Sequence, residues 1–278
     1  MGEPAPGALW GRSTLSWKLN SRWFVLLGGP RAAILQVAHP AVAAGVAEYS
    51  AYRTDPLGRL ERTLEAMLAI GFAPPGRRAE VLDRLERIHR RVTGTTADGA
   101  SYEATDPELQ YWVLATLVDT VLEVERRFVG RLRERDRARY FEESTALAAA
   151  FGVPPSLVPT DLDAFRDYMR DRFATLRPSA QSVDITASLM RPGLRFVPDP
   201  AFVPLNWITA TLLPTRLRHQ LGVADLNPAE LAAVRSGALV MRATLPHLDG
   251  LLGSNPLNGR AIRGGAGGAR GASAHEAA

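Results

Sequence analysis

Two arginines, a threonine and a histidine are the residues of this sequence best placed to do chemistry. Arg59, Arg62 and Thr63 lie close together in the chain, and His89 follows within Ile88-His89-Arg90-Arg91-Val92. On a helix, Arg59 and Thr63 share a face and Arg62 lies nearby, because residues three and four apart are neighbours. An imidazole can ligate haem iron, and guanidinium groups bind carboxylates or polarised oxygen. The set is therefore compatible with a haem site, although the local pattern does not require one.

Structural interpretations of the same residues stay open at this point. Glu61 and Glu65 are close enough to pair with the two arginines, which would make them a solvated charge stripe. His89 borders the apolar face of its predicted helix, where a histidine is often only a structural residue. A functional reading requires Arg59 or Arg62 to point inward, where a propionate or an oxygen anion could accept a bidentate bond.

The histidines give no multi-ligand metal site. None of the five is spaced i, i+4 from another, so no helix supplies a two-histidine zinc site. Glu86-x-x-His89 matches one element of four-helix di-iron proteins, but that architecture needs two such elements and two further glutamates. His39 precedes Pro40, which favours extended backbone and a structural role between two helix ends.

Composition excludes several classes of function. The 278 residues contain no cysteine, so disulfides, iron–sulfur clusters and cysteine-ligated haem or zinc are impossible. The net charge is +4, of which the arginine-containing stretch 259–278 supplies +2, so the body is only weakly basic. The segment Arg84–Arg91 could suggest a DNA recognition helix, but no Gly-containing turn and no clear partner helix accompany it. We expect no nucleic-acid partner, and we find no phosphate-binding loop or dinucleotide fingerprint.

The longest apolar stretch does not read as a membrane span. Residues 23–46 are interrupted by Arg31, His39, Gly28-Gly29 and two prolines. We therefore expect no transmembrane segment and a cytoplasmic location, although part of this stretch could touch a membrane surface.

Helical periodicity dominates the chain and strand signals are scarce. Asp55 precedes Pro56 and is expected to act as an N-cap, and Asp106-Pro107 is expected to open a long helix. Spacing of apolar residues, prolines and glycines predicts helices over 31–38, 40–51, 56–71, 77–92, 107–132, 135–151, 162–176, 203–213 and 228–251. The fold class is therefore all-α.

A single helical bundle domain is the simplest organisation, because no internal repeat or linker is visible. We expect an N-terminal arm over 1–22, a helical domain over 23–257, and a disordered tail over 258–278, where Gly, Ala, Arg and Ser replace apolar residues. Several large side chains are expected either to line an apolar pocket or simply to form the core: Met67, Phe72, Trp112, Phe128 and Trp207.

Short motifs in a defined order resemble a known oxygenase family. They are Ala38-His39-Pro40, Gly45-Val46-Ala47-Glu48-Tyr49-Ser50, Arg53-x-Asp55-Pro56-x-Gly58-Arg59-x-x-Arg62-Thr63, Ile88-His89-x-x-Val92-x-Gly94, Tyr102-x-Ala104-x-Asp106-Pro107-Glu108-Leu109, Trp112-x-x-Ala115-Thr116-x-Val118-Asp119 and Leu213-Pro214-x-Arg216-Leu217-Arg218. Together they resemble the family that includes the latex-clearing (rubber) oxygenase and the fungal mycophenolate-pathway oxygenase. The resemblance covers roughly residues 23–222.

The resemblance implies a partly globin-like all-α domain that binds one haem b, with His89 as the proximal iron ligand. Arg59, Arg62 and Thr63 would line the distal or propionate side. A lysine of the rubber oxygenase matches Arg62; an arginine stays protonated and offers no lone pair, so the sixth iron position should be open or water-bound. Leu114 stands where many relatives carry histidine.

The hypothesis is a haem b-dependent oxygenase that acts with dioxygen on a small apolar or aromatic molecule, oxygenating or cleaving a carbon–carbon double bond. Arg62 and Thr63 would stabilise negative charge on oxygen, and Glu48 would serve as an acid–base group. Asp119 is the candidate hydrogen-bond acceptor for His89. An electron donor and the oligomeric state stay open. The alternatives are a non-catalytic haem carrier or sensor, a cofactor-free helical interaction protein and a DNA-binding repressor.

Overall fold

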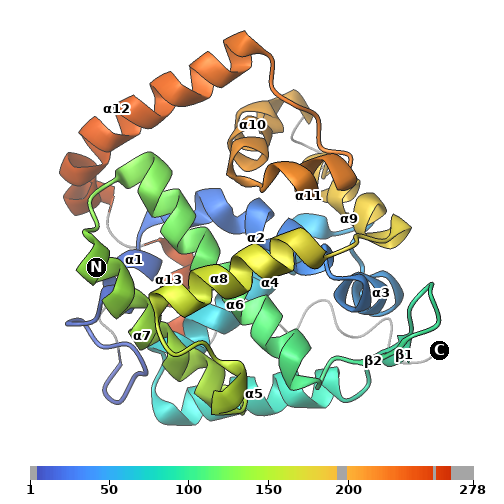
Figure 1. Cartoon of the computed structure of the whole chain (residues 1–278). Helices are drawn as coiled ribbons and strands as arrows, with labels where there is room; N and C mark the ends of the chain where they lie inside the picture. The colour runs from blue at the N-terminus through green and yellow to red at the C-terminus, as the bar shows by residue number, and fades with distance from the viewer. Residues whose placement is uncertain (1–4, 193–198, 253–254, 264–278) are drawn as a thin grey trace.

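Helices make up almost all of the regular structure. The computed structural model describes residues 5–192, 199–252 and 255–263 (Figure 1). Within these ranges the helices are α1 (Leu15–Asn20), α2 (Gly29–Val37), α3 (Pro40–Tyr49), α4 (Pro56–Phe72), α5 (Pro75–His89), α6 (Pro107–Val124), α7 (Glu134–Ala150), α8 (Leu162–Thr175), α9 (Ala180–Met190), α10 (Val203–Leu212), α11 (Thr215–Gln220), α12 (Pro228–Leu252) and α13 (Pro256–Arg263). The predicted all-α fold class is confirmed. The globin-like detail stays a prediction.

Shorter elements connect these helices. They are the 3-10 turns η1 (Trp23–Gly28), η3 (Pro155–Leu157) and η4 (Asp199–Phe202), the π-helical turn η2 (Glu125–Val129), and the strands β1 (Thr93–Thr95) and β2 (Ser101–Glu103). In Figure 1, α12 runs along one edge of the molecule and α5 along the opposite edge. The β1–β2 hairpin projects at the side.

Asp55 caps its helix as predicted, and Asp106 caps the helix that Asp106-Pro107 was expected to open. The Asp55 carboxylate accepts from the backbone N–H of Gly58 at 3.0 Å, and the Asp106 carboxylate accepts from the N–H of Glu108 at 2.8 Å. Each satisfies a backbone donor that the first helical turn would otherwise leave unpaired. The starts of α4 and α6, which carry candidate site residues, are therefore fixed by local chemistry.

Helix α2 is the centre of the core. All nine of its residues are buried, as expected of a helix that is enclosed by others on every side. It packs against α3, α6 and α9. Close approach at its start depends on Gly28, where an added Cβ would lie 2.4 Å from the Cγ2 of Thr120 on α6.

The N-terminal segment, expected as an arm, packs on the helical domain through its tryptophans. Trp10 and Trp17 are buried, and both rings make edge contacts with Phe72 at the end of α4. The indole of Trp10 also covers Gly71, where a Cβ would come within 2.3 Å of the ring. These contacts make α1 and the residues before it part of the same core as α4.

The boundary predicted at residue 258 also falls inside a helix. The helix α13 packs on α4, with Leu257, Asn258 and Ala261 buried. Sparse apolar side chains hid this helix from the sequence prediction. The remaining residues of the predicted tail, 264–278, lie outside the described residues.

Helix α5 ends at His89, three residues earlier than predicted, because a hairpin follows it. Strand β1 pairs antiparallel with β2, with Gly94 opposite Tyr102. A Cβ at Gly94 would lie 2.8 Å from the Tyr102 hydroxyl oxygen, so glycine is needed for this close approach. The turn contains Asp98-Gly99, with Gly99 at φ +89°.

Candidate functional site

The arginines and threonine of the predicted site occupy the first half of α4. Arg62 is exposed and its Nη1 lies 2.8 Å from the Oδ2 of Asp55, the N-cap residue of the same helix. The Thr63 hydroxyl donates to the carbonyl oxygen of Arg59 at 3.0 Å. Its proton is therefore committed to the helix backbone, and in this arrangement the hydroxyl can offer a ligand only an acceptor.

Arg59 differs from Arg62 in its surroundings. It is partly buried, and no described carboxylate lies within ion-pairing distance of it. Burial, and secondly the charge of Arg62, lower the pKa of Arg59 to about 10. The side chain still carries its charge at neutral pH, so it is a desolvated cation without a counter-ion. A bound anion would relieve this cost.

One of the two glutamates expected to pair with these arginines is engaged elsewhere. Glu61 forms an ion pair with Arg260 of α13. No ion pair between Glu65 and either arginine is seen among the described residues, so the charge-stripe interpretation gains no support for Arg59. Arg62, with its exposed partner Asp55, still fits the charge-stripe reading.

His89 is the last residue of α5. Its ring is partly buried, and burial lowers the pKa of the imidazole, so the neutral form that ligates metals prevails at neutral pH. No described side chain hydrogen-bonds to the ring. The preceding residue of the helix, Ile88, is 51% exposed.

Asp119 is not the hydrogen-bond partner of His89, and this prediction was wrong. Its Oδ2 lies 2.6 Å from the Nη2 of Arg31. The same guanidinium donates to the Thr120 hydroxyl at 2.6 Å and to the Leu212 carbonyl oxygen at 2.9 Å. Asp119 compensates the buried charge of α2, which is why it lies on an otherwise apolar part of α6.

Glu48 lies on the exposed end of α3 and is bound to the hairpin. Its carboxylate accepts from the Tyr102 hydroxyl at 3.1 Å. Burial, and then this contact, raise the pKa of Tyr102 to about 12. The nearby Tyr49 hydroxyl donates to the carbonyl oxygen of Thr93 at 2.9 Å. These contacts attach α3 to the hairpin; an acid–base role for Glu48 stays a prediction.

The predicted site residues thus lie on three consecutive helices. Helix α4 packs against α5, and α3 packs against β1 directly after α5. No hydrogen bond or ion pair within the described residues joins His89 to Arg59, Arg62, Thr63 or Glu48. The structure brings their helices together without linking the side chains to one another.

His39 is a buried polar group that the sequence hypothesis left without a role. It is the N-cap residue of α3, and its Nδ1 is buried without a hydrogen-bond partner. Burial, and secondly the charge of Arg172, lower the pKa of His39, while Asp106 opposes this shift. As predicted, His39 lies at the junction of two helices, α2 and α3.

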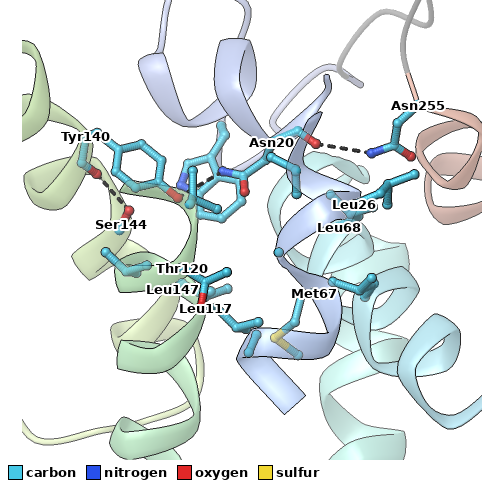
Figure 2. Close-up of a pocket in the computed structure, with 18 residues that line it drawn as sticks. Asn20, Leu26, Met67, Leu68, Leu117, Thr120, Tyr140, Ser144, Leu147 and Asn255 are labelled. Atoms are coloured by element: carbon cyan, nitrogen blue, oxygen red, sulfur yellow. Dashed lines mark hydrogen bonds between the residues drawn. The ribbon is translucent and has the colours of Figure 1, made fainter. Parts of the chain in front are cut away.

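One cavity opens between α2, α4, α6 and α7, with a volume of about 50 Å³ (Figure 2). Of the side chains expected to line a pocket, Met67 lines it, whereas Phe72, Trp112 and Phe128 are fully buried in the core. Trp207 is partly buried on α10. The cavity is far smaller than the roughly 300–1,000 Å³ of sites for drug-sized ligands, and His89 does not line it.

A sequence profile described as the catalytic domain of the ER-bound oxygenase mpaB/B′ and rubber oxygenase matches residues 17–243. The chain belongs to this family. Two uncharacterised proteins, from Mycobacterium bovis and Mycobacterium tuberculosis, are each 27% identical to it over 176 residues. The match covers 62% of this chain and 66% of each relative, just under two thirds of the relatives' length. No solved structure matches the chain.

Two further observations bear on how an mpaB/rubber oxygenase domain of this sequence could hold a cofactor. Among the described residues, no group of three or more His, Asp or Glu side chains could hold a metal ion, which gives the di-iron alternative no support. Within the same residues, no helix has both the length and the apolar character to cross a bilayer.

The donor set of this chain fits a haem. His89 offers a neutral nitrogen that no other described residue uses, and the preceding Ile88 offers exposed apolar surface. Arg59 offers a cation without a counter-ion, which matches the negative charge of a propionate. A porphyrin needs these three kinds of partner: an axial ligand, an apolar contact and a cation.

Proposed function

We propose that this chain is a haem b-dependent oxygenase that acts with dioxygen on a small apolar or aromatic molecule, oxygenating or cleaving a carbon–carbon double bond. The observation that carries the proposal is the family match over residues 17–243. The unpartnered His89 and Arg59 support the haem. A haem would supply the electron transfer and dioxygen chemistry that side chains lack.

Each site residue would contribute in a different way. His89 would hold the iron through a ring nitrogen, and Arg59 would pair with a propionate. Arg62 would donate hydrogen bonds to oxygen atoms that gain negative charge during the reaction, an effect worth up to ~3 kcal/mol per donor. Its ion pair with Asp55 is exposed, so breaking that pair would cost less than about 1 kcal/mol.

Thr63 would support Arg62 only after its hydroxyl turns away from the Arg59 carbonyl. In the observed rotamer it would accept a hydrogen bond, for example from a water or a substrate hydroxyl. Glu48 would exchange protons with the substrate only if it released the Tyr102 hydroxyl. Both proposals require a rearrangement of one side-chain contact.

A non-catalytic haem carrier or sensor is the second candidate. The observation in its favour is that Arg62 is already paired with Asp55 through Nη1 and that the Thr63 hydroxyl donates to the Arg59 carbonyl oxygen. In that case His89 and Arg59 would hold the haem, and Arg62 and Thr63 would keep these contacts.

Oxygen uptake separates the two candidates. The haem-loaded full chain would be mixed with a reductant and a panel of apolar and aromatic alkenes. An oxygenase consumes dioxygen faster with one of these alkenes, and the products gain one or two oxygen atoms by mass spectrometry. Arg62→Gln should lower this rate by about tenfold or more. Haem binding without alkene-dependent uptake would favour the carrier.

A further inference from the structure

The cavity between α2, α4, α6 and α7 is not explained by the haem hypothesis. Its walls are Ala32 of α2, Leu64, Met67 and Leu68 of α4, Leu117 and Val121 of α6, and Leu147 of α7 (Figure 2). None of the predicted haem-binding residues lines it. Met67 nevertheless follows Thr63 by one helical turn, so the cavity adjoins the candidate site along α4.

Each polar side chain of the cavity named here already makes at least one hydrogen bond within the protein. The Asn20 side-chain amide donates to the Tyr140 hydroxyl, and the Ser144 hydroxyl donates to the Tyr140 carbonyl oxygen. The Asn255 amide donates to the Asn20 carbonyl oxygen, and the Thr120 hydroxyl accepts from Arg31. A buried water needs two to four polar partners, so water gains little by entering.

Size then selects the occupant. A volume of about 50 Å³ exceeds the roughly 10–15 Å³ that one water needs but is far below the roughly 300–1,000 Å³ of a site for a drug-sized molecule. Apolar cavities that stay dry bind apolar molecules of matching size. We propose that this cavity binds a small uncharged gas, and that dioxygen is its occupant during turnover. The second half of this inference rests on the proposed oxygenase function.

Three of the lining side chains are partly exposed and can provide access. Leu26, Met67 and Leu117 are partly exposed, whereas Leu68, Val121 and Leu147 are buried. The unbranched side chain of Met67 can change rotamer easily, because three of its bonds rotate. A gas can therefore enter past Met67 and Leu117 and rest against the buried wall.

Xenon tests binding without haem or turnover. Carbon–proton methyl spectra of the full chain would be recorded under increasing xenon pressure. We expect saturable shifts at the methyl groups of Leu117, Val121 and Leu147, and none at the exposed Leu239 of α12. The absence of saturable shifts in the folded protein would overturn the proposal.

Two substitutions locate the xenon. Ala32→Val adds two methyl groups to the wall and should abolish the shifts, while Ala233→Val on the exposed face of α12 should leave them unchanged. Leu147→Ala enlarges the cavity and should increase the shifts, which keeps the test decisive if Ala32→Val fails to fold. Equal xenon shifts in Ala32→Val and the unaltered chain would contradict binding at this cavity.

The dioxygen part has its own readout. In the haem-loaded enzyme, Ala32→Val should raise KM for dioxygen several-fold with kcat unchanged, and Ala233→Val should change neither. Xenon binding together with an unaltered KM would overturn the role in turnover and leave the gas site in place. A chain that took up no haem and showed no oxygenase activity after haem titration would contradict the proposed function, while the xenon result stood independently.

Discussion

The Nη2 of Arg31 lies 2.6 Å from the Oδ2 of Asp119, and this pair joins the central helix α2 to α6. The Arg31 side chain is only 3% exposed and that of Asp119 is 23% exposed. A charge at the centre of a helical core requires such compensation, since an unpaired buried cation is costly. Hydrogen bonds to Thr120 and Leu212 complete the surroundings of the guanidinium.

Removing one partner of this pair should destabilise the fold. Asp119→Ala leaves the Arg31 charge buried and should lower the free energy of unfolding by about 3 kcal/mol, measured by urea denaturation. Asp167→Ala, which breaks the exposed pair with Arg170, should cost less than about 0.5 kcal/mol. Equal losses in the two variants would contradict the structural role of Asp119.

Arg59 should lower the stability of the haem-free protein and strengthen haem binding. Arg59→Met removes a desolvated cation and should raise the free energy of unfolding without haem by about 1 kcal/mol. The same variant should bind haem several-fold more weakly. The measurements are urea denaturation and haem titration. The control is Arg62→Met, at an exposed and paired position, which should leave the free energy of unfolding and the haem affinity almost unchanged. If Arg59→Met were stabilised but kept full haem affinity, the propionate role would be excluded.

Asn255 connects the two ends of the chain. Its carboxamide oxygen accepts from the N–H of Leu257 at 2.9 Å and so caps α13, while its amide donates to the carbonyl oxygen of Asn20 in α1. Asn255→Ala should therefore lower the free energy of unfolding by about 1–2 kcal/mol. Asn255→Asp retains the cap acceptor and should recover part of this loss in the same denaturation experiment. A neutral Asn255→Ala would show that α13 adds nothing to stability.

The buried His39 should make folding sensitive to acid. Burial lowers its pKa below the ordinary 6.5, so the unfolded chain binds more protons and stability falls as the pH drops below about 6.5, until the lower folded pKa is reached. Arg172 adds to this effect and Asp106 opposes it. Urea denaturation at pH 7.5 and pH 5.5 should show a smaller loss for His39→Gln than for the unaltered chain. An equal loss of stability in His39→Gln and the unaltered chain would show that His39 does not cause the acid sensitivity.

Local chemistry made much of the fold predictable. The prolines after Asp55 and Asp106 indicate the starts of two helices, and in the structure each aspartate accepts from its own first turn. The end of α5 was not predictable in the same way. Val92 continues the apolar pattern of the helix, but the backbone leaves the helix before this residue because β1 pairs with β2. Helix α9 carries a usable signal that was overlooked, the capping box of Ser179 and Ser182.

Side-chain partners were harder to predict than helices. Asp119 lies 88 positions from Arg31 in sequence, and nothing in the local pattern of either residue specifies the other. Glu61 was expected to serve the arginines of its own helix, yet it pairs with Arg260 of α13. Such pairings depend on how distant helices pack, so the candidate site could be placed on its helices but not connected from one sequence.

Haem titration of the purified full chain tests the central claim most directly. The unaltered protein and His219→Ala, a substitution at the surface of α11, should both bind one haem with the same Soret band before and after dithionite and carbon monoxide. His89→Ala should bind it far more weakly or with a shifted spectrum. Haem bound by His89→Ala with unchanged affinity and an unchanged spectrum would contradict the account.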